Sequence, residues 1–314
     1  MTLFKRKIKV AVAMSGGVDS SVAALLMKKQ GYDVVGFFMR NWSEQLPEIK
    51  GCPWETDQKD AQMVAQQLRI PFYVLNFEKE YYAKVVQYMI DSYKNGLTPN
   101  PDIMCNQEIK FGIFLERMMK LGFAKIATGH YARVLNKDGR FWLGAGLAES
   151  KDQSYFLCRV TEQQLSKTLF PVGEMPKAEV RQLAEKNNLV TAKKKDSQGV
   201  CFIGQIKVSD YLKRKMKGTK GNIVDINSKA VLGKHVGLEF FTTGQRQGIE
   251  VGGTGPYYVV ERKFSTGELF VTTDHDDPKL YRTEFLLTDV RWITHAPALP
   301  WSGSIRIRYQ HALI

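Results

Sequence analysis

Hydrophobic and polar positions repeat with two different periods along the first two thirds of the chain. Apolar, β-branched runs predict strands at Ile8–Met14, Tyr32–Met39, Pro71–Phe77 and Lys125–Thr128. Helical spacing predicts helices at Ser20–Gln30, Thr56–Leu68, Glu78–Lys94 and Phe111–Leu121, the second with Thr56 or Asp57 as N-cap. Such alternation predicts right-handed βαβ crossovers and an α/β fold whose parallel sheet is covered on both faces.

The pattern changes after residue 206. A basic helix is predicted at Val208–Lys217, and short β-branched and aromatic runs follow at Asn222–Asp225, Leu238–Thr243, Pro256–Glu261 and Leu269–Thr273. We therefore expect an α/β domain (1–206), a small β-rich central domain (207–282) and a second β unit (283–314). The last unit is short for an independent domain, so we expect it to pack on its neighbour or to be an incomplete part of a longer chain.

The net charge adds a class of partner to this picture. The 314 residues carry a formal net charge of +13, with ordinary hydrophobic (44%) and charged (25%) contents. Such an excess favours a polyanion such as nucleic acid, through phosphate neutralisation and counterion release. No apolar run approaches the ~20 residues that a membrane helix needs. The basic N-terminus leads into a glycine turn without a signal-cleavage site, so we expect a cytoplasmic protein.

A glycine-containing turn joins the first predicted strand to the first predicted helix. Its sequence is Ser15-Gly16-Gly17-Val18-Asp19-Ser20-Ser21. The glycines permit a tight turn and close approach of a ligand, and the unpaired amides of the helix N-terminus suit phosphate. The turn is neither a Walker A sequence, which ends Gly-Lys-Ser/Thr, nor GxGxxG. It predicts a phosphate site at which Asp19 would assist Mg²⁺.

Four cysteines, Cys52, Cys105, Cys158 and Cys201, occur without a CxxC pair, which gives little support to a cysteine-ligated metal site. The prolines of Thr98–Asn106 predict an extended loop around Cys105, and Asp102 lies three residues before it. Cys201 follows Lys193–Lys195, whose charges lower a thiol pKa. Most cysteines outside disulfides are buried and inert. Loop placement favours reactivity for Cys105 and Cys201, whereas the apolar run around Cys158 predicts a core position.

These segments together resemble one family, the bacterial and organellar tRNA-specific 2-thiouridylases of the N-type ATP pyrophosphatases. The resemblance covers most of the chain in the family's order. It rests on Ser15–Ser21, Met39–Trp42, Asn100–Cys105, Lys110–Gly112, Thr128–Tyr131, Lys151–Phe156, Asp196–Gly204 and Thr243–Gly248. It implies a Rossmann-like, parallel-sheet PP-loop domain, a β-rich central domain and a C-terminal β-barrel of which 283–314 is only the start.

The resemblance also implies site residues, position by position. ATP, with Mg²⁺, would contact Ala13, Met14, Ser15, Gly16, Gly17, Val18, Asp19, Ser20, Met39 and Gly129. The target base would contact Asn100, Pro101 and Asp102, and the tRNA would contact Lys151, Asp152, Gln153, Arg308 and Tyr309. Cys201 would carry a persulfide, and Cys105 would release or resolve it, in the second case through a Cys105–Cys201 disulfide. Asp102 is the candidate general acid/base, and the role of His130 stays open between nucleotide contact and strand-end orientation.

The implied reaction is adenylation of the C2 oxygen of a tRNA uridine, followed by attack of persulfide sulfur. The implied partners are the tRNAs for Lys, Glu and Gln and an upstream persulfide donor, with a monomer as the default. The basic residues Lys213, Arg214, Lys215, Lys217 and Lys220 would hold tRNA phosphates, although a merely solvated surface explains them too. Two alternatives stay open: another adenylating enzyme with this loop (a tRNA lysidine synthetase, a GMP-synthetase-like amidase or an argininosuccinate synthetase), and a non-catalytic RNA-binding module that responds to ATP.

Overall fold

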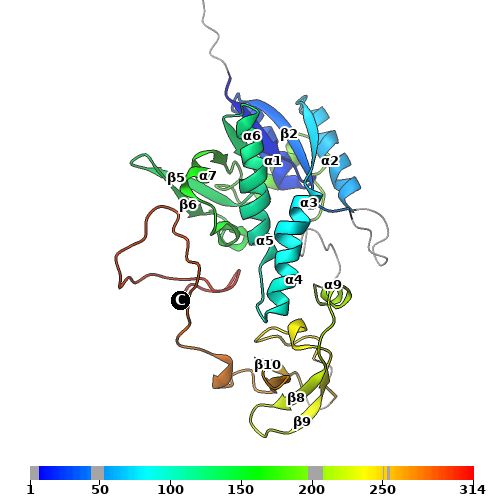
Figure 1. The fold of residues 1–314 in the computed structure, drawn as a ribbon. Helices are drawn as coiled ribbons and strands as arrows, with labels where there is room; N and C mark the ends of the chain where they lie inside the picture. Colours follow the sequence, from blue (N-terminus) through cyan, green and yellow to red (C-terminus); the bar gives the residue numbers. More distant parts are fainter. Residues whose placement is uncertain (1–6, 44–52, 197–207, 250, 253–254) are drawn as a thin grey trace, which may run out of the picture. The chain divides into compact units, whose positions relative to one another are not determined.

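The computed structural model describes residues 7–43, 53–196, 208–249, 251–252 and 255–314 (Figure 1). The chain divides into two compact units. Met1–Val85, Asp102–Gly204 and Arg291–Ile314 form the first unit, and Val86–Pro101 with Gln205–Val290 form the second unit.

A five-stranded parallel sheet forms the centre of the first unit, in the order β3-β2-β1-β4-β7 (Figure 1). Its strands are β1 (Lys9–Ala13), β2 (Asp33–Arg40), β3 (Phe72–Asn76), β4 (Lys125–Ala127) and β7 (Thr168–Leu169). Val10, Ala11 and Val12 of the central strand are completely buried. A parallel strand covered on both faces requires this continuous apolar sequence, and the predicted parallel sheet is confirmed.

Helices cover both faces of this sheet. The helices in this part of the chain are α1 (Val18–Lys29), α2 (Pro53–Gln67), α3 (Glu78–Tyr81), α5 (Pro101–Met104), α6 (Leu115–Lys120), α7 (Glu162–Ser166) and α8 (Lys177–Lys186), with the shorter turns η3 (Glu149–Lys151) and η4 (Ser154–Leu157). Val22 of α1 and Val64 of α2 share one buried cluster with Phe38 of β2. The preceding residue, Phe37, points to the opposite face, where its ring centroid lies 6.0 Å from that of Phe114.

The predicted extended loop over Thr98–Asn106 holds for Thr98–Asn100, which are in no helix or strand, but is wrong from Pro101 onward, where the chain is helical. α5 begins at Pro101 and continues as the π-helix η2 (Cys105–Phe114) into α6. A proline is tolerated in the first turn of a helix because no hydrogen-bonded N–H is needed there. The π turn also requires glycine at Gly112. A Cβ there would lie only 2.8 Å from the carbonyl oxygen of Gln107, five residues earlier, and would clash with it.

Three further expectations for the first unit need correction. α2 begins at Pro53, so neither Thr56 nor Asp57 is its N-cap. An antiparallel hairpin of β5 (Ala132–Lys137) and β6 (Arg140–Ala145) follows β4 and has no counterpart in the predicted elements. Cys158 is exposed rather than in the core, because the apolar run before it forms the 3₁₀ turn η4 and not a strand.

The second unit is β-rich, as predicted. It contains α4 (Gln87–Lys94), α9 (Val208–Lys215), β8 (Gly221–Asp225), β9 (Val231–His235), η5 (Leu238–Phe240), β10 (Tyr258–Lys263), β11 (Glu268–Thr272) and η6 (Pro278–Leu280), and the π turn η1 (Tyr82–Val86) precedes α4. Its sheet has the order β10-β11-β8-β9, and Val224, Val260 and Phe270 form a small core. The predicted strand at Leu238–Thr243 is wrong, since 3₁₀ turn η5 stands there, and β9 was not foreseen.

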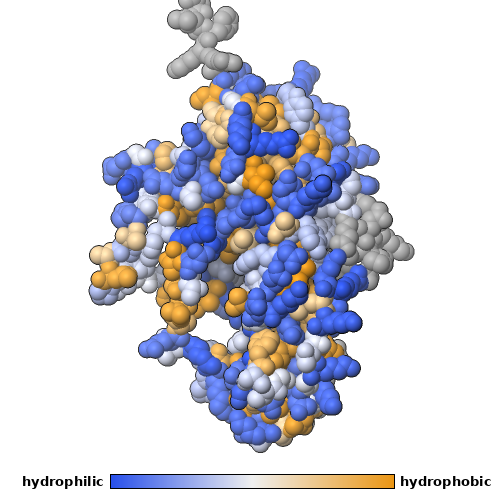
Figure 2. Space-filling model, viewed as in Figure 1, coloured by the Kyte–Doolittle hydropathy of each residue, from blue (hydrophilic) through white to orange (hydrophobic). Residues whose placement is uncertain are grey.

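Residues 283–314, all of which are described, contain no helix or strand, so the second β unit predicted there is not formed in this structure. Their apolar side chains are largely exposed, and Leu286 and Leu299 are 87% and 84% accessible. Figure 2 shows one face of the molecule, where hydrophilic residues predominate and hydrophobic ones are interspersed. Among the described residues, none of the helices combines the length and apolar character that crossing a membrane requires. The domain limits at 206/207 and 282/283 stay a prediction.

Candidate active site

The predicted phosphate turn lies between β1 and α1 and needs glycine at its bend. Gly16 has a φ of +76°, and a Cβ there would lie 2.2 Å from the carbonyl oxygen of Asp57. Ser20 and Ser21 are buried, and their hydroxyls donate to the carbonyl of Gly17 at 3.1 and 2.8 Å. These hydroxyls therefore hold the shape of the turn, while Ser15 is exposed at its tip.

Gly129 brings the end of β4 against the start of α1. A Cβ at Gly129 would lie 2.6 Å from the amide nitrogen of Ser20 and 2.7 Å from the carbonyl carbon of Asp19. Met39 lies near the carboxyl end of β2, beside β1. The residues expected to contact ATP thus gather at the carboxyl ends of three adjacent parallel strands, where open α/β sheets bind their ligands.

A network of charged side chains surrounds Asp19. Lys177 Nζ donates to both carboxylate oxygens of Asp19 at 2.8 Å and lies 2.7 Å from Asp196 Oδ1. Arg181 and Lys151 also bind Asp196, at 2.7 and 3.0 Å. Burial alone would raise the pKa of Asp196, but hydrogen bonds from Lys177 and Lys151 lower it to about 2. Sequence reasoning missed Lys177, because a pair separated by 158 positions leaves no local pattern.

Tyr131 joins this network to the predicted tRNA segment Lys151–Gln153. Its hydroxyl donates to Asp19 Oδ1 at 2.8 Å. Burial and the Asp19 carboxylate raise the pKa of Tyr131, so the hydroxyl keeps its proton. The backbone of Tyr131 pairs with Gln153: the Tyr131 amide donates to Gln153 Oε1 at 3.0 Å, and the Gln153 amide donates to the Tyr131 carbonyl at 2.8 Å.

Asp152 is buried and engaged inside the protein. Its carboxylate accepts from the Gly146 amide at 2.9 Å and from the Ser154 amide and hydroxyl at 3.1 and 2.8 Å, and Arg306 lies 3.3 Å away. These bonds to its own loop show that the Asp152 carboxylate supports the shape of the loop. A direct contact of Asp152 with tRNA stays a prediction.

Tyr309 lies close to the Lys151–Phe156 segment, which contains Asp152. Its ring centroid is 4.4 Å from that of Phe156, and Arg308 next to it is exposed. A cavity of about 440 Å³ between these parts of the first unit is lined by Glu149, Ser150, Asp152, Arg306, Tyr309 and Gln310. All five residues expected to contact tRNA away from the target base therefore lie on two neighbouring segments. Arg306, which sequence reasoning missed, links the two segments through its ion pair with Asp152.

The candidate catalytic pair Asp102 and Cys105 lies one helical turn apart on α5 and η2, and Cys105 is buried. Burial raises the pKa of Asp102, and the positive charge of Lys110 opposes this rise. Asn100 and Pro101 immediately precede this pair in the sequence and belong to the second unit. Cys201 and most of Asp196–Gly204 lie outside the described residues, and so does Cys52.

His130 is held by neighbours on both ring nitrogens. Its Nδ1 is 2.7 Å from the Thr128 hydroxyl, and its Nε2 is 3.5 Å from Lys110 Nζ. Burial, reinforced by the charge of Lys110, keeps the pKa of His130 well below its usual range. Since Lys110 offers only donors, Nε2 accepts and Nδ1 donates to Thr128. These contacts favour orientation of the end of β4, one of the two roles left open above, which stays a prediction.

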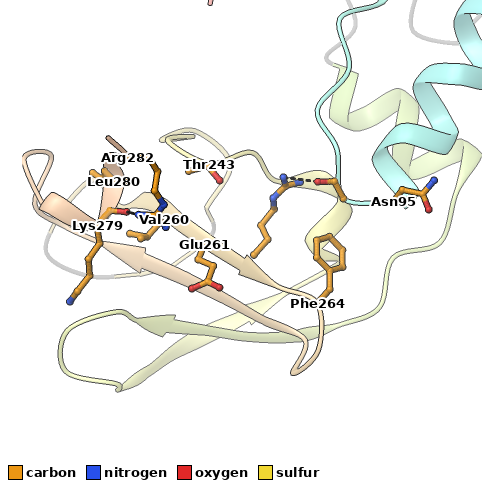
Figure 3. Close-up of a pocket in the computed structure, with 10 residues that line it drawn as sticks. Asn95, Thr243, Val260, Glu261, Phe264, Lys279, Leu280 and Arg282 are labelled. Carbon is orange, nitrogen blue, oxygen red and sulfur yellow. Dashed lines mark hydrogen bonds between the residues drawn. The ribbon is translucent and has the colours of Figure 1, made fainter. Parts of the chain in front are cut away.

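A separate hollow of about 430 Å³ lies in the second unit (Figure 3). At this hollow, the Arg262 guanidinium donates to the carbonyl oxygen of Gly96 at 2.8 Å. Among the motif residues that the structure describes, Thr243 of the Thr243–Gly248 segment is the one that lines this hollow.

Comparison with known proteins places these features in one family. A family model described as the tRNA methyl transferase HUP domain matches residues 8–205, and one described as the tRNA methyl transferase PRC-barrel domain matches residues 209–273. The tRNA-specific 2-thiouridylase of Alkaliphilus oremlandii is 45% identical over 300 residues, which are 95% of this chain and 82% of that protein. That of Bacillus subtilis is 46% identical over 286 residues, 91% of this chain and 76% of that protein.

A solved NMN synthetase from Francisella tularensis aligns with 62% of this chain and 68% of its own, at 16% identity and a TM-score of 0.40, and we base no argument on so distant a likeness. The sequence relatives and the family models, in contrast, extend over most of the chain. The chain belongs to the family of the tRNA-specific 2-thiouridylases.

Proposed function

We propose that this enzyme uses ATP to adenylate the C2 oxygen of a uridine in tRNA, and then replaces that oxygen with sulfur carried by Cys201. The observation that supports the proposal most directly is the approach of Gly129 to the start of α1, beside the bend at Gly16. Side chains are excluded from both positions, which leaves backbone amides accessible to phosphate at a helix N-terminus. The relatives' names supply the tRNA uridine as substrate.

In the first step, the C2 oxygen attacks the α-phosphorus of ATP and the bond to the β-phosphate breaks, which releases pyrophosphate. The amides of Gly16 and Gly17 would hold the leaving pyrophosphate together with the α1 dipole, since the Ser15 amide already donates to Ser20 Oγ at 3.1 Å. Among the described residues, no group of three or more acidic, His or Cys side chains could hold a metal. Mg²⁺ would therefore depend on Asp19 together with phosphate oxygens, and would neutralise charge on them.

In the second step, the terminal sulfur of a Cys201 persulfide attacks C2, and AMP leaves with the original oxygen. The thiolate of Cys105 then attacks the Cys201 sulfur, and the sulfur–sulfur bond breaks so that its electron pair stays on the sulfur bound to C2. The products are 2-thiouridine and a Cys105–Cys201 disulfide, which an external thiol reduces. We propose the tRNAs for Lys, Glu and Gln as substrates, an upstream persulfide protein as donor, and a cytoplasmic monomer as the working form.

Asp102 would act as the proton acceptor in this site. The variant Asp102→Asn should thiolate tRNA about 100-fold more slowly, a typical loss when a general base is removed. Because the pKa of Asp102 is raised by burial, the wild-type rate should fall on acidification at a higher pH than a solvent-exposed carboxylate would cause. Single-turnover rates as a function of pH test this: an unchanged acidic limb in Asp102→Asn would rule out the role.

The basic cluster of the second unit would bind tRNA phosphates. Lys213 and Lys217 are exposed at and after the end of α9, whereas Lys215 stacks on Tyr211 at 5.5 Å. The double charge reversal Lys213→Glu/Lys217→Glu should weaken tRNA binding by about tenfold or more and flatten its salt dependence. Lys234→Glu, an exposed lysine of β9, is the matched control. Equal tRNA affinity and equal salt slope in both variants would argue for a merely solvated surface.

A further inference from the structure

A chain of ion pairs runs from the phosphate turn to the segment Lys151–Gln153. Lys177 contacts both oxygens of Asp19 at 2.8 Å and Asp196 Oδ1 at 2.7 Å. The other oxygen of Asp196 accepts from Lys151 Nζ at 3.0 Å. The four alternating charges Asp19, Lys177, Asp196 and Lys151 all belong to the first unit.

Asp196 is the residue that contacts both lysines in this series of ion pairs. One of its oxygens faces Lys177 and Arg181, and the other faces Lys151. The Lys177 side chain is only 15% exposed, so solvent and salt screen its pairs less than those of a surface lysine. Arg181 is anchored separately by the carbonyls of Ala192 and Lys194, both at 3.1 Å.

We propose that Asp196 is a positioning residue that couples ATP binding at the turn to tRNA binding at Lys151–Gln153. This inference rests on the proposed function. Phosphates that arrive beside Asp19 attract the ammonium of Lys177 and weaken its pair with Asp196. Asp196 then holds Lys151 more strongly, and Lys151 is less available to a tRNA phosphate. By reciprocity, tRNA bound at Lys151 weakens ATP binding to the same extent.

This coupling has a consequence for the reaction cycle. While the triphosphate is bound, the grip on tRNA through Lys151 is reduced. Once pyrophosphate leaves, Lys177 returns to Asp196 and Lys151 is released toward the tRNA. The adenylated tRNA is then held more tightly than the substrate tRNA during the sulfur-transfer step.

The test measures the tRNA dissociation constant of the full chain with and without saturating α,β-methylene ATP, which cannot be cleaved at the reacting bond. In the wild type, the analogue should raise the constant about fivefold, the lower end of common coupling strengths. In Asp196→Asn this factor should fall below about two, and Asp196→Glu should restore it. Asp60→Asn, which removes a carboxylate paired with Lys194 outside the chain of four, should keep the wild-type factor.

Lys177→Gln reports on the same link and replaces Asp196→Asn if thermal melting shows that the latter is unfolded at the assay temperature. An equal coupling factor in wild type and Asp196→Asn, no coupling in the wild type, or tighter tRNA binding with the analogue would each overturn the inference while leaving the proposed function intact. A wild type that binds neither ATP nor tRNA would instead overturn the proposed function, and the inference with it.

Discussion

Gly16→Ala should lower ATP-dependent AMP formation by about 100-fold or more. A Cβ at this position would stand 2.2 Å from the Asp57 carbonyl oxygen, and contacts under 3.0 Å do not occur, so the turn or the start of α2 must shift by about 1 Å. A misplacement of that size costs about 100-fold when it affects the groups that hold the reacting phosphates. The positive φ of Gly16 adds backbone strain of about 1–3 kcal/mol.

Gly31→Ala separates the two causes of this loss. Gly31 has a similar φ of +87°, but a Cβ there meets nothing within 4 Å. It should therefore lose some stability through strain and keep nearly all of its adenylation activity. The rates are measured as tRNA-dependent release of AMP and pyrophosphate, next to thermal melting curves. If Gly16→Ala is folded and forms AMP at the wild-type rate, the turn is not the phosphate site.

Cys201→Ser should abolish sulfur transfer, with a loss of about 1000-fold or more in 2-thiouridine formation from a persulfide donor. A serine cannot carry the persulfide, so no sulfur nucleophile reaches C2. The adenylation step uses other residues, and AMP and pyrophosphate formation should persist. This division between the two half-reactions distinguishes a sulfur carrier from a residue that merely supports the fold.

Two other cysteines provide matched comparisons for this variant. Cys158→Ser changes an exposed thiol that has no role in the proposed reaction, and it should thiolate tRNA at the wild-type rate. Cys105→Ser removes the buried partner thiol, so the sulfur–sulfur bond would no longer be resolved and turnover should stop. Full thiolation by Cys201→Ser with a protein persulfide donor would contradict the assignment of Cys201 as carrier.

The parallel sheet and its phosphate turn could be predicted because their signals are local. Strands buried on both faces, such as β1, are continuous apolar runs, and the turn carries its glycines within seven consecutive residues. The helix at Pro101 could not be predicted in the same way. Proline is disfavoured in the interior of a helix but is accepted in its first turn. The residue type alone therefore does not tell whether a proline begins a helix or prevents one.

The charged network around Asp19 shows why much of the site escapes sequence reasoning. Asp19 is joined to Lys177 and Tyr131 by side-chain contacts that span 158 and 112 positions. The same holds for the contacts that require glycine at Gly16 and Gly129, since both involve backbone from other elements. Motifs therefore identified candidate residues, whereas their partners and the ion-pair chain through Asp196 emerged from the three-dimensional arrangement.

The most direct test of the account is thiolation of unmodified tRNA by the wild-type enzyme with ATP, Mg²⁺ and a persulfide donor, measured by retardation of the tRNA in a mercury-containing gel. The account predicts retarded tRNA that depends strictly on ATP, with AMP and pyrophosphate formed in step with 2-thiouridine. Retardation that occurs equally without ATP, or AMP release from tRNA that never gains sulfur, would contradict it.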